Sequence, residues 1–164
     1  MNHSKDKVMK TRHFLLALLL LVNIGSLQAS SATSLLLPKP QQVVENGATF
    51  DLGRPVVLTD PTNSTLLASL FTTSGSATAV VTVNLVSAAT LGTFDYTLAD
   101  FPNEGYKLEV ATDAITITAA TKTGVIRAAQ TLMQLATATG GTGIPGVSIT
   151  DYPAFKLRGI MHDV

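Results

Sequence analysis

The last ten residues of the chain hold a close group of side chains that can bind or move charge. Arg158, His162 and Asp163 stand within an apolar run, residues 155–164, that is typical of a β-strand. A guanidinium donates several hydrogen bonds in one plane, a carboxylate accepts them, and an imidazole titrates near neutral pH. No residue follows in this sequence to close a pocket around these groups. We therefore expect a leading domain followed by the first strand of a domain that is missing here.

The spacing of these groups does not by itself place them in one site. Side chains of a strand alternate between its two faces, so Arg158 and His162 share a face and Asp163 lies on the other. Arg158 and Asp163 reach a common site only through a bulge or a strand end near Asp163. Proximity in sequence is thus no independent support for a shared role.

The first 32 residues are typical of an export signal. An apolar stretch, Phe14–Val22, follows a basic start, and the small residues Ala29–Ala32 offer cleavage sites. The basic residues are Lys5, Lys7, Lys10 and Arg12. The apolar stretch is shorter than the ~20 residues that span a bilayer, which disfavours the alternative of an uncleaved anchor. We expect a signal peptide over residues 1–32, export to the periplasm or outside the cell, and no membrane span after cleavage.

The remaining residues carry a small negative charge. Residues 33–164 hold seven Lys or Arg and ten Asp or Glu, and seven minus ten gives −3. The basic residues are scattered, so nucleic acid is not an expected partner. The sequence has no Cys, which excludes disulfides, a lipid anchor on Cys and Cys-bound zinc. His3 and His13 lie in the signal, so His162 lacks a second His for a metal site, and we expect neither metal nor cofactor.

The clearest structural pattern occupies residues 105–138. Gly105–Val110 and Ala114–Ala119 alternate apolar and polar residues, and their short link predicts a hairpin. Thr123–Ala138 then reads as a helix capped by Thr123. Its predicted core residues are Val125, Ile126, Ala129, Leu132, Met133 and Leu135. We assign Met133 to core packing rather than to a ligand site.

Turn residues organise the first half of the domain. Asn46-Gly47 between the apolar runs Gln42–Val44 and Ala48–Leu52 predicts a β-hairpin, because both turn residues accept positive φ. Asp60-Pro61 predicts the start of a helix that ends near Gly75. Further strands are expected at Arg54–Leu58, Ala79–Leu85, Ile144–Ile149 and, within a loop, Tyr96–Leu98. Two helices on one face of a mostly antiparallel sheet make a two-layer α+β sandwich.

Three short motifs occur in order between residues 36 and 164. They are Leu36-Leu-Pro-Lys-Pro40, the series from Gly105-Tyr106 to Gln130-Thr-Leu-Met-Gln-Leu135, and the set Asp151, Pro153, Phe155, Arg158, Gly159 and Asp163. Together they resemble the N-terminal domain of family 20 glycoside hydrolases, the β-N-acetylhexosaminidases. The third motif is similar to the junction that leads into that family's catalytic barrel.

The resemblance implies a (β/α)₈ barrel, a fold of about 250 residues, after this domain. It implies action on terminal N-acetylglucosamine or N-acetylgalactosamine, in which the sugar's own 2-acetamido oxygen attacks the anomeric carbon. An adjacent Asp-Glu pair holds the acetamide and protonates the leaving oxygen. This sequence has no adjacent Asp and Glu. We expect no catalytic residue in this chain, residues 33–150 to support the absent barrel in cis, residues 151–164 to begin it, and the chain alone to be inactive.

The same resemblance gives roles to the final residues. Arg158 matches an arginine that hydrogen-bonds the hydroxyls of the terminal sugar; the alternative is pairing with a carboxylate in the barrel wall. Asp163 matches an aspartate at the end of the first barrel strand, either contacting substrate or orienting its neighbours. His162 stands where the family has an apolar residue, and we expect it to be part of the wall.

A second class of function stays open. The chain can be a complete exported module that binds carbohydrate or another protein. Carbohydrate platforms usually need exposed aromatic rings, whereas this chain has no Trp, and its tyrosines are Tyr96, Tyr106 and Tyr152. We expect Tyr106 to be packed. An open reading frame after codon 164 favours the enzyme, and a natural stop favours the module.

Overall fold

The computed structural model describes residues 31–91 and 103–154, and the chain divides into units after Ser31. Residues 1–30 of the predicted signal peptide, the predicted strand at Tyr96–Leu98 and the final run at residues 155–164 lie outside the described residues. The described elements all belong to the unit Ala32–Val164. They are the 3₁₀ helix η1 (Ala32–Leu35), β1 (Gln42–Asp51), β2 (Val56–Thr59), α2 (Thr65–Ala68), β3 (Ala79–Leu85), α3 (Ala88–Leu91), β4 (Tyr106–Val110), β5 (Ala114–Ala119), α4 (Lys122–Ala138) and β6 (Gly143–Asp151).

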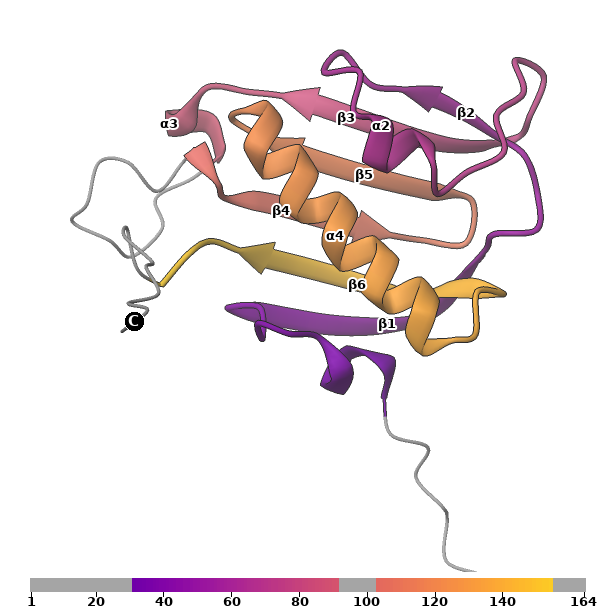
Figure 1. The fold of residues 1–164 in the computed structure, drawn as a ribbon, viewed down its shortest axis with the longest axis horizontal. Helices are drawn as coiled ribbons and strands as arrows, with labels where there is room; N and C mark the ends of the chain where they lie inside the picture. Colours follow the sequence, from indigo (N-terminus) through magenta and orange to yellow (C-terminus); the bar gives the residue numbers. More distant parts are fainter. Residues whose placement is uncertain (1–30, 92–102, 155–164) are drawn as a thin grey trace, which may run out of the picture. The chain divides into compact units, whose positions relative to one another are not determined.

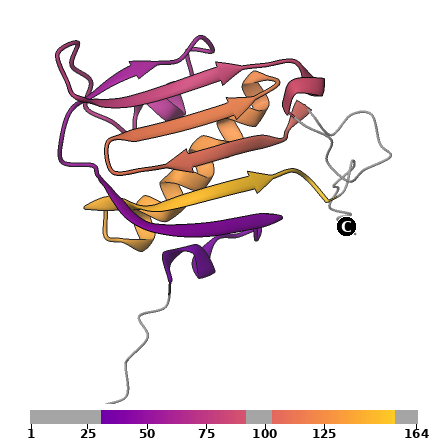
Figure 2. The same cartoon turned by 180° about the vertical axis from the view of Figure 1, so that it is seen from behind.

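Six strands form one open, mixed sheet in the order β1-β6-β4-β5-β3-β2. The pairs β1–β6, β6–β4 and β4–β5 are antiparallel, while β5–β3 and β3–β2 are parallel. Helix α4 runs across one face with α2 beside it (Figure 1). The other face carries neither α2 nor α4 in the view from behind (Figure 2). The predicted α+β class, with two helices on one face, is confirmed.

Alternating burial explains why the sheet and α4 form one core. On β4 and β5 every second residue is buried. One side of α4 is buried as well. The inward residues are Tyr106, Leu108, Val110, Ile115, Ile117 and Ala119 from the strands and Val125, Ala128, Ala129, Leu132, Leu135 and Ala136 from the helix. Gly124 allows the close approach, because a Cβ there would lie 2.5 Å from the Gly105 carbonyl oxygen.

The prediction for residues 105–138 is confirmed except at its edges. β4 and β5 form the expected antiparallel hairpin, and α4 ends at Ala138 as predicted. The cap is Thr121 rather than Thr123: its Oγ1 accepts a hydrogen bond from the Gly124 N–H at 3.3 Å. The assignment of Met133 to the core is wrong, since its side chain is 42% exposed. Ala129 is buried as predicted, and Ala128 and Ala136, which the predicted set left out, are buried on the same helix.

The predicted hairpin at Asn46-Gly47 is wrong. Residues 42–51 form one strand, β1, whose register against β6 shifts between Glu45 and Thr49. Gly47 has φ +75°, and Asn46 donates from Nδ2 to the Val110 carbonyl at 3.0 Å. The bulge therefore uses the positive φ of Gly47, which a tight turn would also use, and it bends the strand instead of reversing it.

The predicted helix after Asp60 is shorter and starts later. Asp60 accepts hydrogen bonds from the Thr62 and Ser64 N–H groups, each at 2.8 Å, and so forms a turn. Ser64 caps α2, which spans only Thr65–Ala68. The chain is extended again at Thr73, which bridges to Val56. The helix α3 was not predicted.

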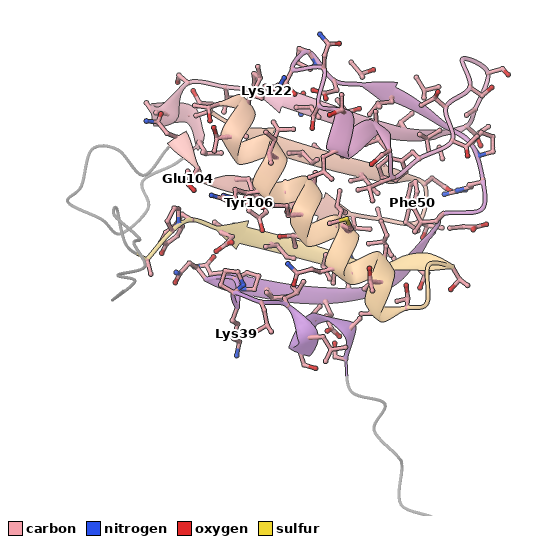
Figure 3. All side chains as sticks on the ribbon, in the orientation of Figure 1. Lys39, Phe50, Glu104, Tyr106 and Lys122 are labelled. Atoms are coloured by element: carbon pink, nitrogen blue, oxygen red, sulfur yellow. The ribbon has the colours of Figure 1, made fainter. Side chains whose placement is uncertain are left out.

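A separate cluster ties the far end of the sheet together. Phe50 and Phe71 meet edge to face at a centroid distance of 6.1 Å, and the Arg54 guanidinium lies 5.2 Å from the Phe50 ring centre. Arg54 also pairs with Asp113 at 2.6 Å. Figure 3 places Phe50 at the opposite end of the sheet from Glu104, and this cluster is therefore distinct from the site described next.

Candidate functional site

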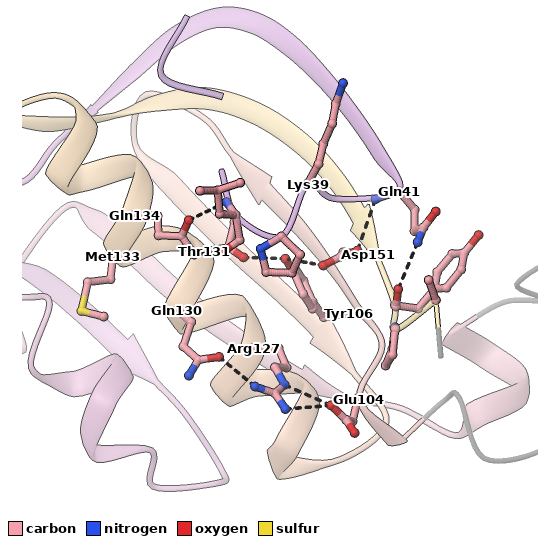
Figure 4. A pocket seen from close by; sticks show the side chains of 15 residues that line it. Lys39, Gln41, Glu104, Tyr106, Arg127, Gln130, Thr131, Met133, Gln134 and Asp151 are labelled. Atoms are coloured by element: carbon pink, nitrogen blue, oxygen red, sulfur yellow. Dashed lines mark hydrogen bonds and ion pairs between the residues drawn. The ribbon is translucent and has the colours of Figure 1, made fainter. Parts of the chain in front are cut away.

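A pocket of about 550 Å³ lies where β6 ends. It is bounded by α4, by the ends of β4 and β6, and by residues 37–41, which lead into β1 and are called the lead-in segment below (Figure 4). The lining residues are Leu37, Pro38, Lys39, Gln41, Glu104, Tyr106, Arg127, Gln130, Thr131, Met133, Gln134, Asp151, Tyr152, Pro153 and Ala154. Polar side chains from four parts of the chain thus face one space.

The floor of the pocket is a hydrogen-bonded set of three side chains. Tyr106 and Asp151 are directly opposite each other in the β4–β6 pair. The Tyr106 hydroxyl lies 2.6 Å from Thr131 Oγ1 and donates to Asp151 Oδ2 at 3.4 Å. Burial, with the nearby Asp151 charge, raises the pKa of Tyr106 well above its ordinary value. The phenol therefore stays protonated and can donate over the whole physiological pH range.

Asp151 also holds the lead-in segment. Its Oδ1 accepts a hydrogen bond from the Gln41 N–H at 3.2 Å, and Gln41 Nε2 donates to the Tyr152 carbonyl at 3.4 Å. Burial raises the pKa of Asp151, while hydrogen bonds from the Gln41 and Tyr152 backbone and the Tyr106 hydroxyl act in the opposite direction. The carboxylate consequently carries a desolvation cost that its neutral donors only partly offset.

A second polar group links α4 to the segment before β4. Arg127 donates from Nη2 and Nε to Glu104 Oε2 at 2.9 and 3.1 Å. Its Nη1 donates to Gln130 Oε1 at 3.2 Å. Both charged side chains are about a third exposed, so water weakens the pair, which we expect to contribute at most about 1 kcal/mol. It mainly fixes the direction of the Arg127 guanidinium.

Gln134 clamps the lead-in segment with a side-chain amide. It accepts from the Leu37 N–H at 2.8 Å and donates to the Leu37 carbonyl at 3.0 Å, as a neighbouring strand would. The Leu37 side chain remains 77% exposed, and Met133 is exposed one residue before Gln134. The pocket thus has a polar floor and an apolar rim.

The hydrogen bonds of the pocket fasten distant segments of the chain to one another. Within residues 31–91 and 103–154 no three His, Asp or Glu side chains gather as metal ligands. Across the same ranges no helix is long and apolar enough to cross a bilayer. What the described side chains do is hold the lead-in segment, the end of β6 and α4 in fixed relation.

The chemically active residues of the final run are not among those described. Arg158, predicted to contact the sugar, Asp163, predicted to contact substrate or to orient its neighbours, and His162, predicted to be part of the wall, all lie in residues 155–164, so their roles stay predictions. The pocket residues Tyr106, Thr131, Gln134 and Asp151 belong to the recognised motifs, but only the packing of Tyr106 was predicted, and it is confirmed at 1% exposure. The sequence signal that could have indicated the pocket was the presence of polar residues, such as Thr131 and Gln134, within a motif that is otherwise apolar.

The sequence matches one family model, and the fold is similar to that of several solved structures. The family model described as glycosyl hydrolase family 20, domain 2, matches residues 33–152. A family 20 exo-β-N-acetylglucosaminidase from Vibrio harveyi, solved with N-acetylglucosamine, is 26% identical over 77% of this chain and 20% of its own, with a TM-score of 0.51. A chitobiase from Flavobacterium johnsoniae is 25% identical over 82% of this chain and 23% of its own, with a TM-score of 0.54. The chain spans about a fifth of the length of these solved enzymes.

Proposed function

This chain belongs to glycosyl hydrolase family 20, whose domain 2 it carries, and on that premise we propose that it is the N-terminal support domain of an exported β-N-acetylhexosaminidase. The observation that supports this most strongly is the match of residues 33–152 to a domain found within far longer enzymes. In the proposal a catalytic (β/α)₈ barrel follows in cis. Residues 1–32 direct export and are removed.

The proposed reaction is removal of terminal N-acetylglucosamine or N-acetylgalactosamine from glycans or chitooligosaccharides. The 2-acetamido oxygen of the sugar attacks its own anomeric carbon, and an adjacent Asp-Glu pair in the barrel assists, as the family's exceptional mechanism requires. The similar enzymes, one solved with N-acetylglucosamine and one described as a chitobiase, support this substrate class. Arg158 and, in one of its two proposed roles, Asp163 contact the terminal sugar.

The role of the described domain is to hold and orient. Its polar contacts join segments at the end of β6, where residues 151–164 are proposed to start the barrel. Active sites of such barrels gather at the C-terminal ends of the strands. A rigid domain that fixes the entry of the first strand would keep Arg158 and Asp163 in place, and we propose that this is how the domain serves catalysis.

The experiment is to sequence the gene and transcript past codon 164, express the complete product, and assay it with p-nitrophenyl N-acetyl-β-glucosaminide and the galactosaminide. We expect an open frame that contains an adjacent Asp-Glu, activity in the complete product, and none in residues 33–164 alone. Replacing that Glu by Gln is the control for contaminating activity. A stop directly after codon 164, or turnover by residues 33–164, would overturn the proposal.

A further inference from the structure

The carboxylate of Asp151 faces the pocket without a cation beside it. Within the part of the chain that the structure describes, no Lys or Arg lies within ion-pair distance of it. The cations that line the pocket are directed elsewhere: Arg127 is bound to Glu104, and the Lys39 side chain points away from Asp151 (Figure 4). The donors to Asp151 are neutral, namely the backbone N–H groups of Gln41 and Tyr152 and the Tyr106 hydroxyl.

A partly buried carboxylate with neutral donors favours the arrival of a positive group. Removal from water raises the pKa of Asp151, and an opposite charge nearby would reverse that effect. The Arg127 guanidinium is paired with the Glu104 carboxylate, so among the described charged groups of the lining Asp151 is the acidic one that lacks an ion-pair partner. The chemistry of the floor is thus suited to a guanidinium or an ammonium.

The rim of the pocket suits the aliphatic stem of such a group. Leu37 and Met133 expose apolar surface on the α4 side, and Pro38 and Pro153 line the pocket as well. Lys and Arg lay their methylene stems along apolar surface while their charged heads reach a polar partner. A volume of about 550 Å³ accommodates one such side chain together with an apolar neighbour.

The position of the pocket indicates where the occupant comes from. Asp151 is the last residue of β6, and part of the wall is formed by Tyr152, Pro153 and Ala154, which directly precede the residues proposed to continue into the barrel. A partner tethered there has a high effective concentration at the pocket. We propose that the pocket seats a basic side chain of the catalytic domain, with its charged head on Asp151 and its stem against Leu37 and Met133. This inference rests on the proposed function, which supplies that domain.

The test uses the complete protein and measures how firmly the two domains hold together. Thermolysin cleavage between the domains is followed for the wild type, Asp151→Asn, Asp151→Lys and the control Glu109→Gln. Asn keeps an oxygen for the Gln41 N–H but removes the charge, while Lys places two cations together. Glu109 also loses a carboxylate, but it is exposed on the opposite face of the sheet, where it bonds Ser148. Circular dichroism of the 164-residue variants checks that the domain still folds.

We expect cleavage at least tenfold faster for Asp151→Asn, faster still for Asp151→Lys, and unchanged for Glu109→Gln. Folded Asp151 variants that are cleaved at the wild-type rate would overturn the inference and leave the proposed function intact. Asp151-dependent dimerisation of the 164-residue chain would also overturn it, because the occupant would then be a second copy. A gene that ends at codon 164 removes both proposals, and sequencing alone distinguishes that case.

Discussion

The two sides of helix α4 are built in opposite ways. The side facing the sheet carries apolar residues such as Leu132, which is fully buried against strands close to α4 in the sequence. The side facing the pocket carries Gln134 and Arg127, with Gln134 bonding a residue 97 positions away. Burial of apolar area stabilises the first side without regard to direction. The second side depends on directional hydrogen bonds between distant segments. The stability of the domain and the placement of the lead-in segment and the end of β6 are therefore separable.

The largest effect should come from the sheet-facing side. Ile117→Ala removes a fully buried side chain at the centre of β5 and should lower the free energy of unfolding by about 2–5 kcal/mol, because the cavity cannot fully collapse. Urea unfolding of the 164-residue chain measures it. Lys107→Ala, on the exposed face of neighbouring β4, is the control and should stay within about 0.5 kcal/mol. Equal losses for the two variants would contradict the assignment of the core to one face.

The floor of the pocket should give the next effect. Tyr106→Phe keeps the buried ring but removes the hydroxyl that meets Thr131 and Asp151. Because a buried partner is left unsatisfied, we expect a loss of about 1–3 kcal/mol. A double-mutant cycle with Thr131→Val measures the interaction, and a coupling energy near zero would show that the hydrogen bond contributes nothing.

Asp151 should change the pH dependence of stability. Its pKa is raised by burial in the folded protein, so the folded state binds a proton at Asp151 more tightly than the unfolded state does. The stability due to protonated Asp151 is therefore present at low pH and is lost as pH rises from the ordinary carboxyl pKa through the raised one. Asp151→Asn abolishes this loss, and its free energy of unfolding relative to wild type should rise across that window. Parallel pH profiles of the two proteins would refute the effect.

The sheet-facing side could be predicted from the sequence because its contacts are local. The strands β4 and β5 and the helix α4 follow one another, and each shows its own period. The first half of the domain was harder to predict, because the sequence Asn46-Gly47 fits both a tight turn and the bulge that forms. Asp60 likewise suits a helix cap and the turn that it makes. In each case tertiary pairing, absent from the local pattern, decides between two conformations.

The pocket could not be predicted in the same way. Its motif residues were recognised, but the bond from Gln41 to Asp151 joins residues 110 positions apart. No periodicity records such a pairing, because it depends on the order in which β1, β6 and β4 assemble. The exposure of Met133 was missed for a related reason: an apolar residue at an open rim looks like core until the sheet is in place.

The smallest effect should come from the clamp on the lead-in segment. Gln134→Ala removes both hydrogen bonds to the Leu37 backbone, and because this contact is exposed to water the loss of stability should be about 0.5–1.5 kcal/mol. Gln130→Ala is the matched control, since its amide lies on the same helix but bonds Arg127 rather than the lead-in. Amide hydrogen exchange should accelerate at Leu37 only in the first variant, while the β4 and β5 amides keep their protection. Exchange that accelerates along β4 as well would mean that the two sides of α4 are one cooperative unit, and the separation drawn between stability and placement would fail.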